Sequence, residues 1–306
     1  MIKHTIEISQ QPMHLTSRHG QLLLESYDQP DAKPRSIPCE DIGIVIIDHP
    51  RTTYSHAALK TLLDHDAAIV ICGDNHQPNG IMLPLSEHSQ QVSRLQEQIN
   101  LTKPTCKKLW KQIVVAKIKA QACNLPDHAK GINTLKQLAA DVKSGDPQNH
   151  EAQAARAYWA NWLTDLPKHN TFKRDQNGHD PANAFLNYGY AILRAAVGRA
   201  IVSAGLHPAL GIHHHNRSNA FCLADDLMEP LRPLVDRRVR ECLKRDREKL
   251  DQLTKAYLLE LLAEPVQYEK QTGPLMVQLH RYLASLVNVY QGQCKKLPFP
   301  TALPLP

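Results

Sequence analysis

Two different hydrophobic periods divide the chain near residue 87. Before that point apolar and polar residues mostly alternate with a period of two, which is typical of β-strands. The run IGIVIID at 42–48 is apolar throughout, so we expect both faces of that strand to be covered. The segment 55–66 has helical spacing, with Ser55 as its cap. The remaining strands are expected at 4–9, 13–17, 21–26, 67–72 and 77–85, with turns at 18–20 and at Asn79-Gly80.

From residue 88 onward the hydrophobic period becomes that of an α-helix. Helices are expected at 90–101, 107–125, 132–145, 150–166, 183–205, 222–250, 254–263 and 274–291. The pattern predicts an α+β protein: a small β-rich domain with one helix at 1–87, then a larger, nearly all-α domain at 88–291. Residues 292–306 form a tail with four prolines in KKLPFPTALPLP, which should be extended and free to dock on a partner.

Composition narrows the class of protein only slightly. The chain has 306 residues, of which 42% are apolar and 22% charged, as in soluble globular proteins. Its formal net charge of +6 is compatible with a nucleic-acid partner but does not require one. Seven cysteines without a C-x-x-C pair favour a reducing compartment. Because no secretory leader and no membrane-length apolar run is found, we expect a cytoplasmic protein.

Glu151 lies near the start of a predicted helix, on the side that carries its apolar stripe. In EAQAARAYWANWL the apolar positions recur at helical spacing from Ala154 to Leu163, and Glu151 is three residues before the first of them. A buried carboxylate at this position needs a cation or hydrogen bonds to compensate its charge. The alternative is an ordinary first-turn glutamate that interacts with the helix dipole and is partly solvated.

Asp226 and Glu229, in DDLMEP, have a spacing that places both carboxylates on one helical face, where they could hold one hard cation. A structural alternative is also open, in which Asp225 or Asp226 caps a helix and Glu229 pairs with Arg232. Because Pro230 disfavours helix at the residue before it, we expect a kink or a helix start at Glu229.

Three consecutive histidines, His213, His214 and His215, precede this acidic pair. Adjacent residues of a loop cannot all face one metal, so at most one or two of them could be ligands. A polar turn after Gly211 is the alternative, and zinc is disfavoured because no C-x-x-C or H-x-x-x-H pattern is present. One imidazole with two or three carboxylates suits Mg²⁺ or Mn²⁺, and such a site beside basic residues suits phosphodiester chemistry.

Several longer blocks resemble a known family. They are CEDIGIVIIDHPRTTYSHAALKTLLDHDAAIVICGDNHQPNGIMLPL near the N-terminus, the helix EAQAARAYW, and the blocks LNYGYAILR and DLMEPLRP. Over about residues 2–291 the chain resembles the CRISPR-associated spacer integrases, the Cas1 family, in their short form from type II systems. The resemblance implies dimerisation through the β-rich domain and catalysis by the helical domain.

The resemblance also implies a site and a reaction. Glu151, His214 and Glu229 match the family's catalytic metal ligands, with Asp226 as an auxiliary carboxylate, and the neighbouring histidines leave the imidazole open by one position. The implied enzyme is a Mg²⁺- or Mn²⁺-dependent DNA endonuclease and integrase. In its reaction the 3′-hydroxyl of a short foreign DNA attacks a phosphodiester at the border of a CRISPR repeat. His214 is a candidate for proton transfer.

The implied partners are double-stranded DNA, as spacer precursor and as CRISPR repeat, and other Cas proteins. Two homodimers would bridge a Cas2 dimer in a four-to-two complex, and further type II Cas proteins are candidates; no membrane is expected. The predicted DNA-binding residues are Lys173, Arg174, Arg194, Arg237, Arg238 and Lys244, with Lys107, Lys108 and Lys111 as further candidates. The alternative for each cluster is an ordinary solvated helix face.

Two other functions are open on the sequence. A non-catalytic DNA-binding scaffold of the adaptation complex would bind DNA regardless of metal or of Glu151→Ala. A zinc hydrolase built on the histidine run would hold zinc tightly and would not need Glu151. The intact set of acidic residues speaks against a degenerate site, so integration is the favoured hypothesis.

Overall fold

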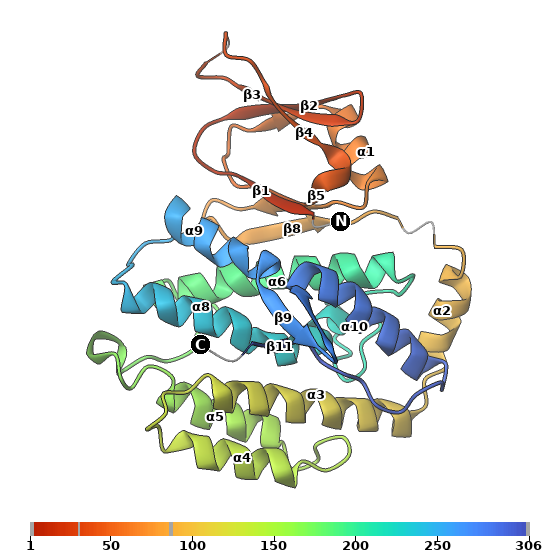
Figure 1. The fold of residues 1–306 in the computed structure, drawn as a ribbon, viewed down its shortest axis with the longest axis vertical. Coiled ribbons are helices and arrows are strands. Elements are labelled where there is room, and N and C mark those ends of the chain that lie inside the picture. The colour runs from red at the N-terminus through yellow and green to blue at the C-terminus, as the bar shows by residue number, and fades with distance from the viewer. Residues whose placement is uncertain (1–2, 30, 86–87, 304–306) are drawn as a thin grey trace.

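The N-terminal part stacks two four-stranded sheets at one end of the long axis of the molecule (Figure 1). The computed structural model describes residues 3–29, 31–85 and 88–303. One sheet has the order β1 (His4–Ile8), β5 (Ile42–Ile47), β7 (Ala68–Cys72), β8 (Pro78–Met82). The other has the order β4 (Arg35–Pro38), β3 (Gln21–Ser26), β2 (Met13–Arg18), β6 (Thr53–Tyr54). Among the described residues these strands come with one α-helix, α1 (His56–Asp64), and a 3-10 turn at Cys39–Asp41. The described N-terminal part is thus rich in β-structure, although β4 and β6 were not predicted.

Strand β5 separates two apolar cores. Val45 and Ile47 face a small core between the two sheets, which also contains Ala58 and Leu62 of α1. The residue that alternates with them, Ile46, is part of the large core shared with the helices. The expectation that both faces of this strand are covered is therefore confirmed. As expected, Ser55 caps α1 by accepting a hydrogen bond from the backbone N–H of Ala58.

The rest of the chain is built mainly from nine described helices. They are α2 (Gln91–Ile99), α3 (Lys103–Cys123), α4 (Gly131–Asp141), α5 (His150–Asn161), α6 (Pro181–Ser203), α7 (Cys222–Met228), α8 (Arg232–Lys244), α9 (Gln252–Leu259) and α10 (Leu275–Tyr290). Helix α6 lies in the middle, and α3, α4 and α5 form the layer farthest from the sheets (Figure 1). Helices α6 and α8 approach so closely at Gly189 that a Cβ on this residue would lie 2.5 Å from Cγ1 of Val235. None of the described helices is long and apolar enough to span a bilayer.

A third sheet corrects the expectation of a nearly all-α second part. It has the order β10 (Gln271–Pro274), β9 (Pro265–Tyr268), β11 (Thr301–Ala302). Strand β11 belongs to the tail that was expected to be free, and Leu297 of the same tail is buried. The tail thus packs on its own chain, with Leu297 in the large core and Phe299 partly buried against it. Residues 304–306 of the tail, and the predicted boundary at residue 87, lie outside the described residues.

The turn expected at Asn79-Gly80 is also wrong. Both residues lie inside β8, where Gly80 pairs with Ile71. The chain reverses earlier, between Gly73 and Gln77, with backbone hydrogen bonds that close the turn. Pairing with β7 therefore overrides the local preference of the Asn-Gly pair.

Candidate active site

The start of α5 is anchored so that Glu151 faces α3. The carboxylate of Asp146 accepts hydrogen bonds from the backbone N–H of His150 and of Glu151, at 2.9 Å each. Asn149 has a left-handed backbone conformation, and its side chain accepts from the N–H of Ala152. Glu151 therefore lies in the first turn of α5, which both readings of the sequence allowed. Its side chain is 27% exposed.

The α-helical pattern is interrupted at Glu229, as expected, although Glu229 itself keeps a helical backbone conformation. A short 3-10 turn, η3 (Glu229–Leu231), separates α7 from α8, and Pro230 is its second residue. Arg232 Nε donates to Glu229 Oε1 at 3.0 Å, so the predicted pairing of these two residues is also confirmed. Burial alone would raise the pKa of Glu229, but Arg232 and Lys117 lower the pKa to about 2. Glu229 is therefore a buried but ionised carboxylate.

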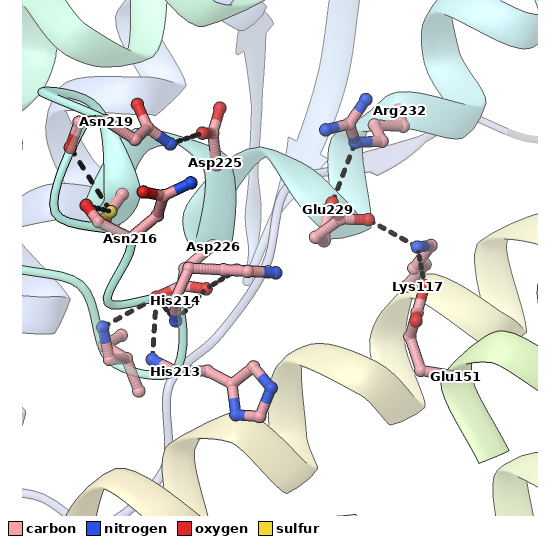
Figure 2. A network of polar contacts seen from close by, with 12 residues as sticks. Lys117, Glu151, His213, His214, Asn216, Asn219, Asp225, Asp226, Glu229 and Arg232 are labelled. Carbon is pink, nitrogen blue, oxygen red and sulfur yellow. Dashed lines mark hydrogen bonds and ion pairs between the residues drawn. The ribbon is translucent and has the colours of Figure 1, made fainter. Parts of the chain in front are cut away.

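Lys117 of α3 links the two acidic residues (Figure 2). Its Nζ pairs with Glu151 Oε1 and lies 2.5 Å from Glu229 Oε2. Burial would lower the pKa of Lys117, but the two carboxylates raise the pKa above its ordinary value, so the side chain is an ammonium. Two carboxylates that are far apart in the sequence thus converge on one cation.

The loop before α7 is wrapped around the carboxylate of Asp226. Asp226 Oδ2 accepts from the backbone N–H of Ile212 at 2.6 Å and of His213 at 2.8 Å, and Oδ1 accepts from His214 Nδ1 at 2.5 Å. Gly211 is required at the start of the loop because a Cβ there would lie 2.2 Å from the carbonyl oxygen of His214. Asp226 is fully buried and both of its oxygens are engaged. Its contacts are therefore those of a residue that orients His214, and its predicted role as an auxiliary metal ligand stays a prediction.

The three histidines have three different environments. The hydrogen bond that His214 donates to Asp226 raises the pKa of His214, and a charge on His214 contributes to the low pKa of Glu229. The ring of His213 stacks on Trp110 of α3, with 4.0 Å between centroids and 3° between planes. His215 is exposed. Of the run, His214 is thus the histidine that a buried carboxylate orients, whereas His213 packs on α3.

The residues fit a divalent metal in part. Among the described residues no three His, Cys, Asp or Glu side chains are arranged as a ready metal-binding group. However, Glu151 and Glu229 already converge on one cation, Lys117. Two carboxylates are donors suited to Mg²⁺ or Mn²⁺, provided that Lys117 moves away. His214 interacts electrostatically with Glu229, but its only described side-chain hydrogen bond is to Asp226, so the structure brings together the two carboxylates and not the imidazole.

Most of the basic residues that were predicted to bind DNA have partners within the chain. Arg174 donates to the side chains of Asn183 and Asn187, and Arg194 pairs with Asp225 at 2.8 Å. The other pairs are Arg237 with Glu264, Arg238 with Glu264 and Glu260, and Lys244 with Glu241. For these five residues the contacts resemble the structural alternative more than a free phosphate-binding surface. Lys173 is exposed and has no side-chain partner among the described residues.

Two groups at the site were not predicted. Lys117 could have been noticed, because it lies on the buried stripe of α3 with Ile113, Val114 and Ile118. The second group is a buried network around Asp236, which accepts hydrogen bonds from Tyr158 at 2.9 Å and from Tyr190. The guanidinium of Arg232 lies 4.7 Å from the centroid of the Tyr190 ring. Tyr190 of this network thus packs against Arg232, the residue that pairs with Glu229.

Comparisons with known proteins agree on one family. The profile of a family described as CRISPR associated protein Cas1 matches residues 6–260. A CRISPR-associated endonuclease Cas1 of Neisseria meningitidis is 34% identical over 297 residues, which cover 95% of this chain and 94% of the relative.

Solved structures share the fold at lower identity. A casposase bound to its integration product superposes with a TM-score of 0.79 at 21% identity, covering 97% of this chain and 92% of the other. A chain of a Cas6-RT-Cas1–Cas2 complex gives a TM-score of 0.78 at 20% identity, covering 97% of this chain and 36% of the other.

Proposed function

The chain belongs to the Cas1 family of CRISPR-associated proteins, and on this premise we propose that it is a metal-dependent DNA integrase. Its substrates would be short foreign DNA fragments and the repeat of a CRISPR array. In the proposed reaction the 3′-hydroxyl of the fragment attacks a phosphodiester at the border of the repeat, and the 3′-oxygen of the cut strand leaves. One phosphodiester is exchanged for another, so no nucleoside triphosphate is consumed.

The observation that carries this proposal is the convergence of Glu151 and Glu229 on one cation. A site that already binds a monovalent ammonium through two carboxylates has the charge and the donor atoms to bind Mg²⁺ or Mn²⁺. In the proposed enzyme Glu151, Glu229 and the imidazole of His214 hold the metal. When bound, the metal would polarise the phosphodiester and stabilise the charge that develops on its oxygens.

The residues of the chain then have distinct roles. Glu229 remains ionised at neutral pH because Arg232 and Lys117 counteract the effect of its burial on the pKa. Asp226 holds the Nδ1–H of His214, so that the other ring nitrogen, Nε2, is the one left to bind the metal or to accept a proton. Arg232 orients the carboxylate of Glu229 through a hydrogen bond to Oε1.

We further propose that exposed lysines contact the DNA backbone. Lys107, Lys108 and Lys111 of α3 and Lys173 of the loop before α6 are exposed, and none has a side-chain partner among the described residues. Their ammonium groups are therefore available to phosphates, and binding should weaken steeply as salt is added. In contrast to the five paired residues, these lysines could bind DNA without breaking a contact of the fold.

Membership of the family also supports a proposal about assembly. The chain would form homodimers, and two of them would bridge a Cas2 dimer. A solved structure that shares the fold is named as a Cas6-RT-Cas1–Cas2 complex, which supports the choice of partner. Size-exclusion chromatography with light scattering, with and without Cas2, measures the masses that this arrangement predicts.

The test of the proposed function is strand joining on a plasmid that bears the cognate repeat. With Cas2 and Mn²⁺ or Mg²⁺ present, we expect Glu151→Gln, His214→Ala and Glu229→Gln each to lower joining by at least about 100-fold, because each removes a proposed metal ligand. Duplex binding, measured by fluorescence anisotropy, should stay within about twofold of the wild type, because the phosphate contacts remain.

A matched control is Glu241→Gln, which changes a glutamate on α8 that pairs with Lys244. This variant should join DNA as the wild type does. Full joining by Glu151→Gln or Glu229→Gln would refute the proposal. Duplex binding by a wild-type protein that never joins DNA would favour the scaffold function, and activity that follows bound zinc would favour the hydrolase.

A further inference from the structure

We propose that Lys117 is an internal counterion of the acidic pair, which holds the position of the divalent metal until the metal displaces it. The inference rests on the proposed metal site at Glu151 and Glu229. Lys117, which is not itself a metal ligand, would limit the affinity of this site for the metal. Lys117 would thereby keep the two carboxylates compatible with the fold when no metal is bound.

The geometry of the two ion pairs is the first argument. Lys117 Nζ pairs with an oxygen of Glu151 and lies 2.5 Å from Oε2 of Glu229. A divalent metal bound by the same two oxygens would lie about 2.0–2.6 Å from each of them. The ammonium and the metal would therefore occupy nearly the same space. Since both are cations, one excludes the other.

Burial is the second argument. The side chain of Lys117 is only 9% exposed, and among the described residues its Nζ has no acceptors other than Glu151 and Glu229. An ammonium in such a place is retained because it compensates buried negative charge. Arg232 pairs with Oε1 of Glu229, whereas Lys117 is the cation that pairs with Oε2 among the described residues.

These contacts predict how the affinity for metal responds when Lys117 is changed. In the wild type an incoming metal must break two ion pairs before it reaches the carboxylates. In Lys117→Met no ammonium competes with the metal for Glu151 and Glu229. The methionine side chain is similar in length to lysine and is also apolar along its stem. We therefore expect the Kd for Mn²⁺ to fall by about tenfold or more.

The experiment is a titration of the full-length protein with Mn²⁺ at fixed pH, in which electron paramagnetic resonance measures the free ion. The matched control is Lys119→Met, an exposed lysine on the same helix without a side-chain partner among the described residues. Lys117→Met should bind Mn²⁺ about tenfold more tightly, and Lys119→Met should bind as the wild type does. An unchanged or weaker affinity in Lys117→Met would overturn the inference.

A second measurement uses only the wild type, in case Lys117→Met does not fold. Acetylation of lysines by an amine-reactive reagent, read by mass spectrometry, reports whether each ammonium is accessible. At saturating Mn²⁺ we expect Lys117 to react several-fold faster than without the ion, whereas Lys119 should not change. Equal reactivity of Lys117 in both conditions would show that the ammonium stays in place, and the inference would be wrong.

Glu151→Gln and Glu229→Gln separate this inference from the proposed function. Both variants should weaken Mn²⁺ binding if these carboxylates hold the metal. If the wild type has no saturable site that depends on them, the proposed metal site fails, and the role of Lys117 fails with it. If the site is present but Lys117 neither limits its affinity nor becomes reactive, only the further inference fails.

Discussion

Asp226 offers the sharpest test of the site at the scale of single residues. Its two oxygens accept hydrogen bonds from the backbone and from His214 in a fully buried position. In Asp226→Asn an NH₂ group replaces one of these acceptors and faces N–H donors. We expect the free energy of unfolding, measured with urea, to fall by about 2–4 kcal/mol.

The control for this variant is Asp127→Asn, which changes an exposed aspartate without a side-chain partner among the described residues. Its stability should stay within about 0.5 kcal/mol of the wild type. If Asp226→Asn unfolded at the same urea concentration as the wild type, the carboxylate would not hold the loop as its contacts indicate.

Asp236 predicts a dependence of stability on pH. Burial raises the pKa of Asp236 from 3.8 to about 7, although Tyr190 and Tyr158 donate hydrogen bonds to the carboxylate. Between about pH 4 and pH 7 the folded protein therefore holds a proton that the unfolded chain has lost. The contribution of this group to stability is present at low pH and is lost as pH rises through that window, by at most about 1.4 kcal/mol per pH unit.

The measurement compares urea unfolding of the wild type and of Asp236→Asn at pH 5, 6 and 7. The variant lacks the titrating group, so its stability relative to the wild type should improve with each step in pH. A difference between the two proteins that is the same at all three values would contradict the assignment.

The residues of the site were predictable to different degrees. Glu151, His214 and Glu229 could be selected as candidate metal ligands, because each is a carboxylate or an imidazole within or beside a sequence block that resembles the Cas1 family. The contacts of Asp226 with the backbone and with His214 were not predicted, because residue type does not distinguish a metal ligand from an acceptor for the chain's own backbone. The role of Lys117 was missed because its partners lie in other elements, and only the tertiary structure brings them together.

At the scale of elements, the C-terminal segment at 295–297 packs on helix α3 and is hydrogen-bonded to it. The backbone N–H of Leu297 donates to Gln112 Oε1 of α3 at 2.9 Å, and Gln112 donates to the carbonyl of Lys295 at 3.1 Å. Leu297 is 1% exposed. We expect Leu297→Ala to lower the free energy of unfolding by about 2–5 kcal/mol, because the smaller side chain leaves a cavity.

The neighbouring Lys296 is exposed, so Lys296→Ala is the matched control and should leave stability almost unchanged. Thermal unfolding followed by circular dichroism measures both variants. Equal midpoints for the two would indicate that the segment contributes little to the fold, despite its burial.

Elements were predictable where the signal is local. Alternation located β1, β2 and β3, and helical spacing located most helices to within a few residues of their ends. The strands of the third sheet were missed because they are short and contain or adjoin prolines. Moreover, β9 finds its partner β11 more than thirty residues away, at Gln267 and Thr301. Such pairings depend on how the helices pack, which no local pattern encodes.

At the scale of the whole molecule, buried charges join the sheets to the helices. Lys255 of α9 pairs with Asp48, which follows β5, and lies 3.6 Å from Oε1 of Glu7 in β1. The Lys255 side chain is 5% exposed and that of Asp48 is 1% exposed. We expect Lys255→Met to lower the free energy of unfolding by about 3–5 kcal/mol, because it leaves two buried carboxylates without their cation.

Urea unfolding of four variants tests whether Lys255 and Asp48 stabilise each other: Lys255→Met, Asp48→Asn, their double variant and a control. Lys249→Met changes an exposed lysine and should have little effect. The double variant Asp48→Asn with Lys255→Met removes one of the unmatched charges and should recover part of the loss. If the double variant were as unstable as the sum of the single changes, the two residues would not be coupled.

Helix α3 runs for 21 residues without interruption, and three of its side chains have separate tasks. Trp110 supports the histidine loop, Gln112 binds the C-terminal segment, and Lys117 reaches the acidic pair. At 1.5 Å per residue, the last two are only about 7.5 Å apart along a stiff rod. If the C-terminal segment tilted α3, the ammonium of Lys117 would therefore move relative to the carboxylates of Glu151 and Glu229. No flexible segment lies between Gln112 and Lys117.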